Sequence, residues 1–234
     1  MAHHNHDCSH CQARQANPMR NLSTEQVDEL SQCKLAHSYK PGQVIFYEGN
    51  RPFGVYCLEK GKVKLTKYTP DGKSYIIRLV KGGDLLGYRS FLTNEPYSAT
   101  AEVIEEATVC FLDRNIFLQS LRQNPAFALE MLEQLGSDLK QAEDKARDLA
   151  YKSVPERLAE LLFSLKESYG QDTPEGIRLD IRLTREELAS MLGTTIETTV
   201  RNLTRFKEKD LISFDKKYIV LRDLTGLGEF LPQI

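Results

Sequence analysis

The chain has 234 residues, a length that accommodates one large or two ordinary domains. Its 31 Lys and Arg against 33 Asp and Glu leave a formal charge of −2, which excludes nucleic-acid binding through overall positive charge and requires a local patch. Hydrophobic residues make up 41% and charged residues 27%, a balance that excludes general disorder. No apolar run approaches the ~20 residues of a membrane span, and the N-terminus has no signal-peptide pattern, so we expect a cytoplasmic protein without a membrane partner.

Residues 1–21 are predicted to form a polar, irregular tail rich in cysteine and histidine. Within it, Cys8 and Cys11 form a C-x2-C pair, which can bind a soft metal ion or cluster but does not complete a site. A metal-scavenging tail is the alternative. The odd total of five cysteines argues against a disulfide framework. Cys33, Cys57 and Cys110 fall in apolar patterns, where cysteine usually behaves as a small buried hydrophobe.

Residues 22–123 are predicted to form a β jelly-roll sensor domain. A helix opened by Ser23 or Thr24 reaches about Cys33, and short runs of alternating polarity follow, as around Val63 and Leu65. Turn signals separate these runs at spacings typical of a sandwich or jelly-roll barrel: Pro41-Gly42, Glu48-Gly49, Lys60-Gly61, Asp71-Gly72 and Gly82-Gly83.

Residues 124–152 predict one long dimerisation helix. Uncharged residues recur in it at alternating spacings of four and three, which is a heptad seam. A single helix with such a seam requires a partner, so we expect a homodimer rather than a helix that packs only on its own barrel. The seam consists of Ala128, Leu132, Leu135, Leu139, Ala142, Ala146 and Leu149.

Residues 153–234 predict a winged helix-turn-helix domain, so the whole chain is α+β. An amphipathic helix over 156–168, a loop over 168–176 and a strand over 177–181 come first. Thr184 and Glu187 then form a capping box that starts a helix at Arg185, and Gly193 supplies the turn. Thr195 caps a second helix, and strands over 211–214 and 218–221 form the wing.

The second of these helices predicts a DNA-reading surface. Its outer face carries Ile196, Glu197, Val200 and Arg201. An arginine side chain can donate two hydrogen bonds to guanine, and a glutamate can accept one from the cytosine amino group. The two apolar side chains can contact a thymine methyl group. Further DNA-binding residues are the cap Thr195 and three candidates for phosphate contact: Arg205, Lys216 and Lys217.

With these features the chain resembles the Crp–Fnr family of transcription regulators over about residues 22–222. The most specific match lies in residues 183–203 (LTREELASMLGTTIETTVRNL). The resemblance implies a cyclic-nucleotide-binding-like barrel before a winged helix-turn-helix, with the family's base-reading Glu and Arg at Glu197 and Arg201. It also implies a homodimer on double-stranded palindromic DNA, with RNA polymerase as a partner. Gly83-Asp84-Leu85-Leu86-Gly87 resembles the barrel motif before the effector pocket.

The resemblance also addresses the effector. Members that bind cyclic AMP carry a Glu and an Arg-Ser pair, where this chain has Tyr88 and Tyr97-Ser98, so cyclic AMP is not expected. The oxygen-sensing Fnr branch carries a C-x2-C-x5-C tail and one barrel cysteine, and Cys8, Cys11 and Cys110 match three of these positions.

A [4Fe–4S] cluster, with sensing of redox state, oxygen or nitric oxide, is therefore implied. The third tail position is Asn17, which is no thiolate ligand. The fourth ligand stays open among Cys33, His10, Asp7 and other histidines. Zinc, or thiol chemistry without a cofactor, is the alternative.

Two other classes of protein are alternatives. A haem- or small-molecule-sensing regulator of the same fold would use Cys57, Cys110 or His37 as a haem ligand. A jelly-roll metalloenzyme needs ligands inside the barrel, and all five histidines precede the predicted barrel strands. We therefore expect that the protein is not an enzyme.

Overall fold

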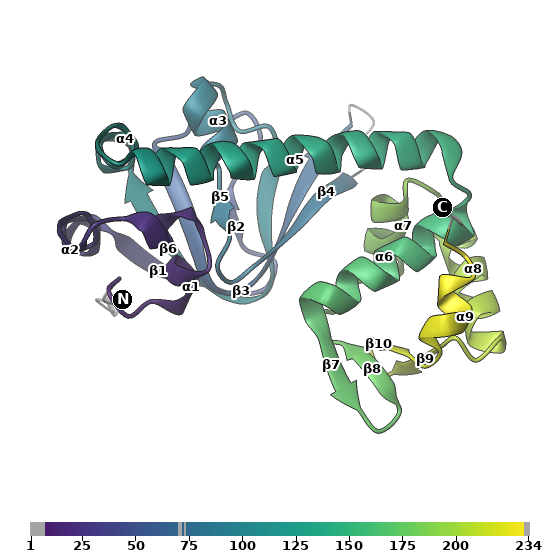
Figure 1. Ribbon diagram of the computed structural model, residues 1–234. Coiled ribbons are helices and arrows are strands. Elements are labelled where there is room, and N and C mark those ends of the chain that lie inside the picture. The colour runs from purple at the N-terminus through teal and green to yellow at the C-terminus, as the bar shows by residue number, and fades with distance from the viewer. Residues whose placement is uncertain (1–7, 70–71, 73, 232–234) are drawn as a thin grey trace. The chain divides into compact units, whose positions relative to one another are not determined.

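The computed structural model describes residues 8–69, 72 and 74–231 (Figure 1). It divides into two compact units, residues 1–140 and 141–234. The helix α5 (Pro125–Tyr151) is continuous across this boundary. None of the helices in the described ranges is long and apolar enough to cross a membrane.

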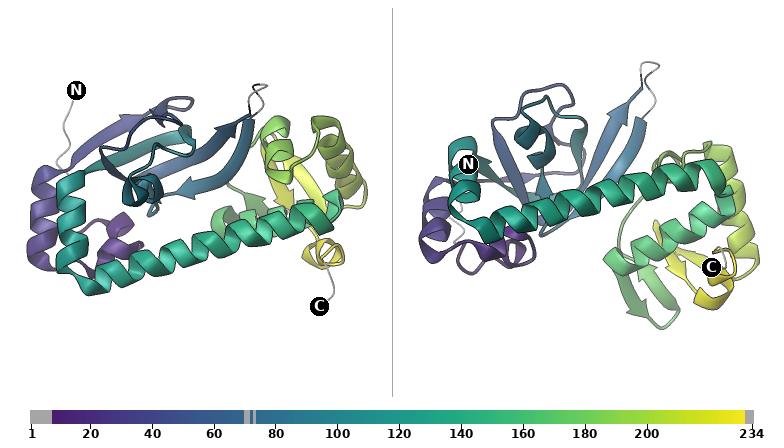
Figure 2. Two further views of the ribbon diagram at one scale, coloured as in Figure 1. Left: turned by 90° about the horizontal axis from the view of Figure 1, so that it is seen from above. Right: turned by 45° about the horizontal axis from the view of Figure 1, so that its top comes forward.

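An antiparallel sheet that curls into a barrel forms most of the first unit, as predicted (Figure 2). Its main path is β1-β6-β3-β4, with β2 paired to β6 and β5 to β3. The strands are β1 (Leu35–Tyr39), β2 (Val44–Phe46), β3 (Gly54–Tyr68), β4 (Ser74–Lys81), β5 (Leu85–Leu86) and β6 (Thr100–Asp113).

The predicted turn at Lys60-Gly61 is wrong, because β3 runs through it. Gly61 has a φ of +97° and sits among register shifts between β3 and β6. A Cβ there would lie 2.4 Å from the Glu106 carbonyl oxygen, so only glycine fits this bend. The register shifts around Gly61 are therefore β-bulges, which bend the long strand β3 instead of ending it.

The N-terminal segment is more ordered than the predicted irregular tail. It contains α1 (Gln12–Gln15), the 3₁₀ helix η1 (Pro18–Asn21) and α2 (Thr24–Cys33), which starts at the predicted Ser23 cap. Ala13 and Met19 are buried in the same core cluster as barrel residues. These short helices form because their few apolar side chains dock on the barrel, which a local pattern does not reveal.

Two further helices and the first part of α5 complete the first unit. The sequence did not predict α3 (Tyr88–Thr93) or α4 (Arg114–Gln123) as helices. Figure 2 shows α2 and α4 side by side at one end of the barrel. The long helix α5 confirms the predicted helical segment, and it buries Phe127, Met131 and Asp138 against the barrel.

The second unit is a winged helix-turn-helix domain. Its sheet has the order β7-β8-β10-β9. Residues that the sequence predicted as a loop form β7. This polar edge strand pairs with β8, and its sequence shows no alternation of apolar residues. The elements are α6 (Val154–Tyr169), β7 (Gly170–Thr173), β8 (Gly176–Leu179), α7 (Arg185–Leu192), α8 (Ile196–Glu208), β9 (Ile212–Asp215), β10 (Tyr218–Leu221) and the unpredicted α9 (Leu224–Gly228).

Candidate functional site

The helix-turn-helix is built from the predicted local signals. Thr184 accepts a hydrogen bond from the Glu187 backbone N–H, and the Glu187 carboxylate accepts one from Thr184, which closes the capping box. Gly193 ends α7 with a φ of +62°. Thr195 then caps α8 by accepting from the Thr198 backbone N–H.

The helix α8 presents the predicted face outward. Thr199, Leu203 and Phe206 are buried beneath it, at 0%, 1% and 0% exposure. On the opposite side Ile196 is 47% and Val200 41% exposed, and Glu197 and Arg201 are exposed as well. Within the described ranges, neither Glu197 nor Arg201 has an ion pair or side-chain hydrogen bond, so both remain available to a ligand.

The candidate Arg205 lies on the same helix but leans on an aromatic ring. Its guanidinium carbon is 5.9 Å from the centre of the Phe230 ring, and Lys209 Nζ is 5.5 Å from the same ring. Both side chains are exposed, so they keep a positive charge beside the end of α8.

The wing carries its lysines where the sequence predicted them. Tyr218 pairs with Asp215, which leaves Lys216 and Lys217 as a two-residue turn between β9 and β10. Lys216 adopts a φ of +55°, and both side chains are exposed.

Two arginines beside the wing were missed by the sequence analysis. Arg182 donates from Nε to the Tyr218 hydroxyl at 2.9 Å, and the Arg185 guanidinium carbon lies 4.5 Å from the centre of the Phe214 ring. The two aromatic residues of the wing, Phe214 and Tyr218, were the available signal, since arginine stacks on such rings.

Replacing Lys216 and Lys217 together with Ala is expected to weaken binding to all DNA sequences alike. Each lost phosphate contact should reduce the slope of log affinity against log salt by about 0.9. Fluorescence anisotropy over a salt series measures this slope. The matched control is Lys67→Ala with Lys81→Ala, two exposed barrel lysines; an equal loss there would contradict the assignment.

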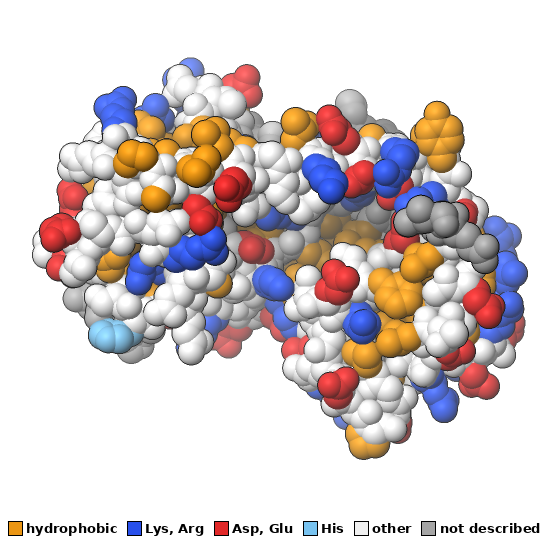
Figure 3. Space-filling view, in the orientation of Figure 1, with side chains coloured by type: hydrophobic (Ala, Val, Ile, Leu, Met, Phe, Trp, Pro, Cys, Tyr) orange, Lys and Arg blue, Asp and Glu red, His pale blue; other side chains and the backbone are white. Residues whose placement is uncertain are grey.

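The outer face of α5 is an apolar surface. Figure 3 shows hydrophobic side chains gathered along this helix. Leu132 is 64% and Leu139 60% exposed, and Ala142 and Ala146 are exposed too. Exposed leucines in a row on one helix indicate a contact with another molecule.

Two predicted seam residues are partly used within the protomer. Leu135 packs against the barrel core. Leu149, 38% exposed, lies so close to Gly193 that a Cβ there would be 2.6 Å from Leu149 Cδ2. Arg157 reinforces this junction by donating to the Lys152 and Leu192 carbonyls at 2.7 and 3.0 Å. The end of α5 is therefore tied to the helix-turn-helix corner.

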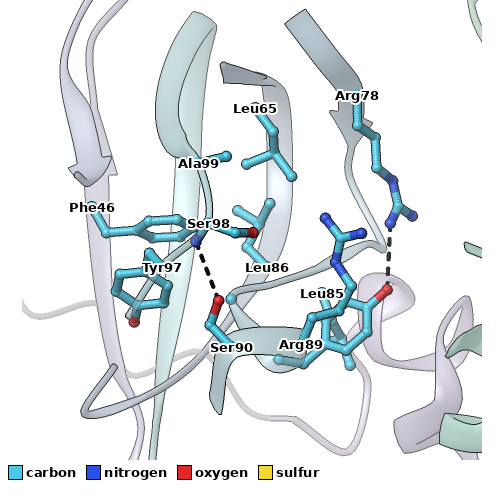
Figure 4. Close-up of a pocket in the computed structure, with 12 residues that line it drawn as sticks. Phe46, Leu65, Arg78, Leu85, Leu86, Arg89, Ser90, Tyr97, Ser98 and Ala99 are labelled. Atoms are coloured by element: carbon cyan, nitrogen blue, oxygen red, sulfur yellow. Dashed lines mark hydrogen bonds between the residues drawn. The ribbon is translucent and has the colours of Figure 1, made fainter. Parts of the chain in front are cut away.

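The barrel contains a pocket at the position of the expected effector site (Figure 4). Tyr97 is 5% exposed and stacks on Phe46, with ring centres 4.0 Å apart. Its ring lies against Gly87, where a Cβ would be 2.8 Å away. Ser90 accepts a hydrogen bond from the Ser98 backbone N–H at 3.3 Å. An aromatic ring thus occupies the position where cyclic-AMP-binding members, by the resemblance, carry an arginine.

A buried polar network joins this pocket to α5. The 7%-exposed Asp138 accepts two hydrogen bonds from Arg78, at 3.0 and 3.1 Å, and one from the Tyr88 hydroxyl. Gln134 donates to the same carboxylate at 3.0 Å. Burial, and then the bond to Asp138, raise the pKa of Tyr88, so it stays protonated as a donor.

Four thiols gather where the N-terminal segment meets the barrel. Cys57 on β3 and Cys110 on β6 are opposite each other in register, and they are 4% and 5% exposed. Cys8 is 4% exposed in the same core cluster, and Cys11 packs against that cluster. All four are free thiols. The expectation that Cys57 and Cys110 are buried is confirmed; the side chain of Cys33 lies outside the described part of the structure.

The electrostatic surroundings of the thiols contain one unusual group. Burial raises the pKa of Cys110 to about 12 against the opposing effect of Lys34. Nζ of Lys34 is buried beside the thiols, and among the residues described no oxygen or nitrogen acceptor reaches it. Its burial lowers the pKa of this ammonium, but Cys8, Cys110 and Cys11 outweigh the burial and the net shift is upward. A buried cation whose neighbours are neutral thiols is costly, so the site favours a negative charge.

No three His, Cys, Asp or Glu side chains converge on a single metal position within 8–69, 72 and 74–231. Of the proposed substitute ligands, His10 is exposed, and Asp7 lies outside the described residues. The statement that all histidines precede the barrel is wrong, because His37 lies on β1; its side chain is exposed and does not enter the core.

Two models of known domain families match this chain, one in each of its two halves. A cyclic nucleotide-binding domain matches residues 36–124, and a Crp-like helix-turn-helix domain matches residues 156–230. The chain belongs to the Crp–Fnr family. It is therefore a DNA-binding transcription regulator with a cyclic-nucleotide-binding-like sensor domain, and Crp-type regulators act as dimers.

Individual relatives differ in what their names report. The anaerobic regulatory protein of Bacillus subtilis is 28% identical over 196 residues, 83% of this chain and 82% of the relative. A CRP-like cAMP-activated global transcriptional regulator of Mycobacterium tuberculosis is 26% identical over 187 residues, 80% and 84% of the two chains. The structure of FixK2 from Bradyrhizobium japonicum shares the fold, with a TM-score of 0.76 at 23% identity over 86% of this chain and 98% of that one.

Proposed function

We propose that this regulator reads a palindromic DNA site as a homodimer and adjusts that reading to redox state, oxygen or nitric oxide through its cysteine cluster. The observation that carries the DNA-reading part is the exposed pair Glu197 and Arg201 on α8, without partners in the described chain. A guanidinium can donate two hydrogen bonds to guanine, and the carboxylate can accept from cytosine. Ile196 and Val200 add apolar surface beside them.

The dimer is the second part of the proposal. The exposed leucines of α5 would bury one another in a parallel helix pair. Two recognition helices then have to lie one DNA turn apart, about 34 Å, to read both half-sites. Contact with RNA polymerase, implied by the family resemblance, stays a prediction.

The sensor is the third part, and it is supported by packing. The thiols of Cys8, Cys57 and Cys110 belong to the same core cluster as Phe127 and Met131 of α5. At the outer side of this contact, Arg20 donates to Glu130 of α5 at 2.6 Å. A change at the thiols would therefore alter the packing of α5, the helix that we propose for dimer formation, which is the differential contact that a switch requires.

The donor chemistry favours a [4Fe–4S] cluster over a single zinc ion. The cysteines with described side chains are all free thiols that belong to or pack against one core cluster, and an iron–sulfur cluster takes one thiolate on each of its irons. The resemblance to the Fnr branch at three of these cysteines implies such a cluster. Cys8, Cys11 and Cys110 would hold it, and Lys34 would offset its negative charge. When bound, the cluster supplies redox chemistry that responds to oxygen.

The barrel pocket argues against cyclic nucleotide as the effector. Tyr97 fills the position where the family resemblance requires an arginine for the cyclic phosphate, and a phenol does not neutralise a phosphate. Of the two guanidinium groups that line the pocket, the half-buried Arg78 already has Asp138 as its partner, and Arg89 Nε lies 4.0 Å from the same carboxylate.

Replacing Cys8 and Cys11 together with Ser tests the sensor. DNA sites are first selected from a random library with anaerobic wild-type protein, and affinity for the selected site is then measured before and after exposure to air. Wild-type affinity should change with air, whereas the variant should show one affinity with an unchanged circular dichroism spectrum.

A variant that responds like the wild type would remove the sensor assignment. Selection of no palindromic sequence would contradict the DNA-reading part of the proposal instead.

A further inference from the structure

Asn17, which occupies the position of the expected third tail cysteine, contacts another cysteine, Cys57. Asn17 is 4% exposed, and its side-chain N–H donates to Cys57 Sγ at 3.5 Å and to the Ala13 carbonyl at 2.9 Å. Its Oδ1 accepts from the Met19 backbone N–H at 2.9 Å. The side chain at position 17 is therefore held against the thiol of Cys57.

Cys57 is placed among the other thiols. It lies opposite Cys110 across the β3–β6 ladder, where directly paired side chains lie on the same face of the sheet. The N-terminal turn with Cys8 and Cys11 packs on the same cluster. Two hydrogen bonds hold the backbone of Cys8 in place: its N–H donates to Ser31 Oγ at 3.1 Å, and its carbonyl accepts from Arg14 at 2.8 Å.

The charge of the site is the second observation. The buried ammonium of Lys34 lies among these thiols, and no oxygen or nitrogen acceptor in the described chain reaches it. Thiols lose their protons when they bind a metal centre, and four thiolates on an iron–sulfur core leave a net negative charge. The fixed cation supplies the compensation that such a group needs in a buried place.

We propose that Cys57 is the fourth thiolate ligand of the iron–sulfur cluster, with Cys8, Cys11 and Cys110, in place of the tail cysteine that Asn17 replaces. This inference rests on the proposed sensor function. It assigns Cys57 a ligand role, where the sequence analysis considered it part of the core, and it excludes Cys33 as the required fourth ligand.

Anaerobic reconstitution with ferrous iron and sulfide tests the assignment. Wild-type protein, Cys57→Ser and the matched control Cys33→Ser are compared by bound iron, acid-labile sulfide and the broad absorption near 400–420 nm. Wild type and Cys33→Ser should load fully, whereas Cys57→Ser should retain roughly a tenth of the iron or less. Cys57→Ala, which keeps the core apolar, should give the same loss if Cys57→Ser does not fold.

Rescue provides the sharpest test. Because the side chain at position 17 reaches Cys57, Asn17→Cys in the Cys57→Ser background should restore a thiolate at the site and most of the bound iron. Full loading of Cys57→Ser and Cys57→Ala, or loss in Cys33→Ser instead, would overturn the role of Cys57 and leave the sensor intact. A wild-type protein that binds no iron would overturn both the cluster and this inference.

Discussion

Replacing Leu139 with lysine is expected to convert the dimer into monomers at micromolar concentration. Leu139 is 60% exposed in the protomer, so the change leaves the protomer's own core intact. In the dimer, two buried leucines contribute about 1.5–3 kcal/mol each, and two facing ammonium groups repel. The loss corresponds to roughly 10²–10⁴-fold weaker association. Sedimentation velocity measures it directly.

The matched control is Glu133→Lys, an exposed position on the same helix but outside the heptad seam. It introduces the same side chain and should leave the sedimentation coefficient unchanged. If both variants stay dimeric, the seam of α5 is not the dimer contact. Circular dichroism of each variant separates dissociation from unfolding.

Replacing Arg201 with Ala is expected to reduce affinity for the selected DNA site by about 1–3 kcal/mol for each half-site read. The physical reason is the loss of a two-pronged hydrogen bond to guanine. Base preference should relax at that position alone, and binding to unrelated DNA should change little. Competition binding with single-base variants of the site measures both effects.

Arg201→Lys is the informative companion to this variant. Lysine keeps the positive charge, so attraction to phosphates is preserved, but it lacks the planar fork that recognises guanine. It should therefore lose base discrimination while it retains the salt dependence of the wild type. Wild-type discrimination in Arg201→Ala would show that Arg201 does not contact bases.

The features that sequence analysis predicted well depend on neighbours along the chain. The Thr184–Glu187 capping box, the glycine turn at Gly193 and the outward face of α8 follow from spacings of three and four residues. The heptads likewise predicted the helix α5 from a local period. The winged helix-turn-helix could therefore be assembled from the order of these signals.

The features that it missed depend on partners far along the chain. The strand β7 forms because β8 pairs with it, and its own residues are polar. The N-terminal helices form because Ala13 and Met19 find the barrel core. Leu149 looks like a seam residue by spacing, yet part of it packs against Gly193, more than forty residues later.

By itself the sequence determined the outward face of α8 and the apolar stripe of α5, which we propose for DNA reading and for pairing with a second copy, because helical periodicity places side chains on faces without reference to the rest of the fold. Only the tertiary structure decided the surroundings of the cysteines. Cys57 faces Cys110 through strand register, and Asn17 reaches Cys57 through the docking of the N-terminal segment. Both contacts join residues tens of positions apart, so no local pattern encodes them.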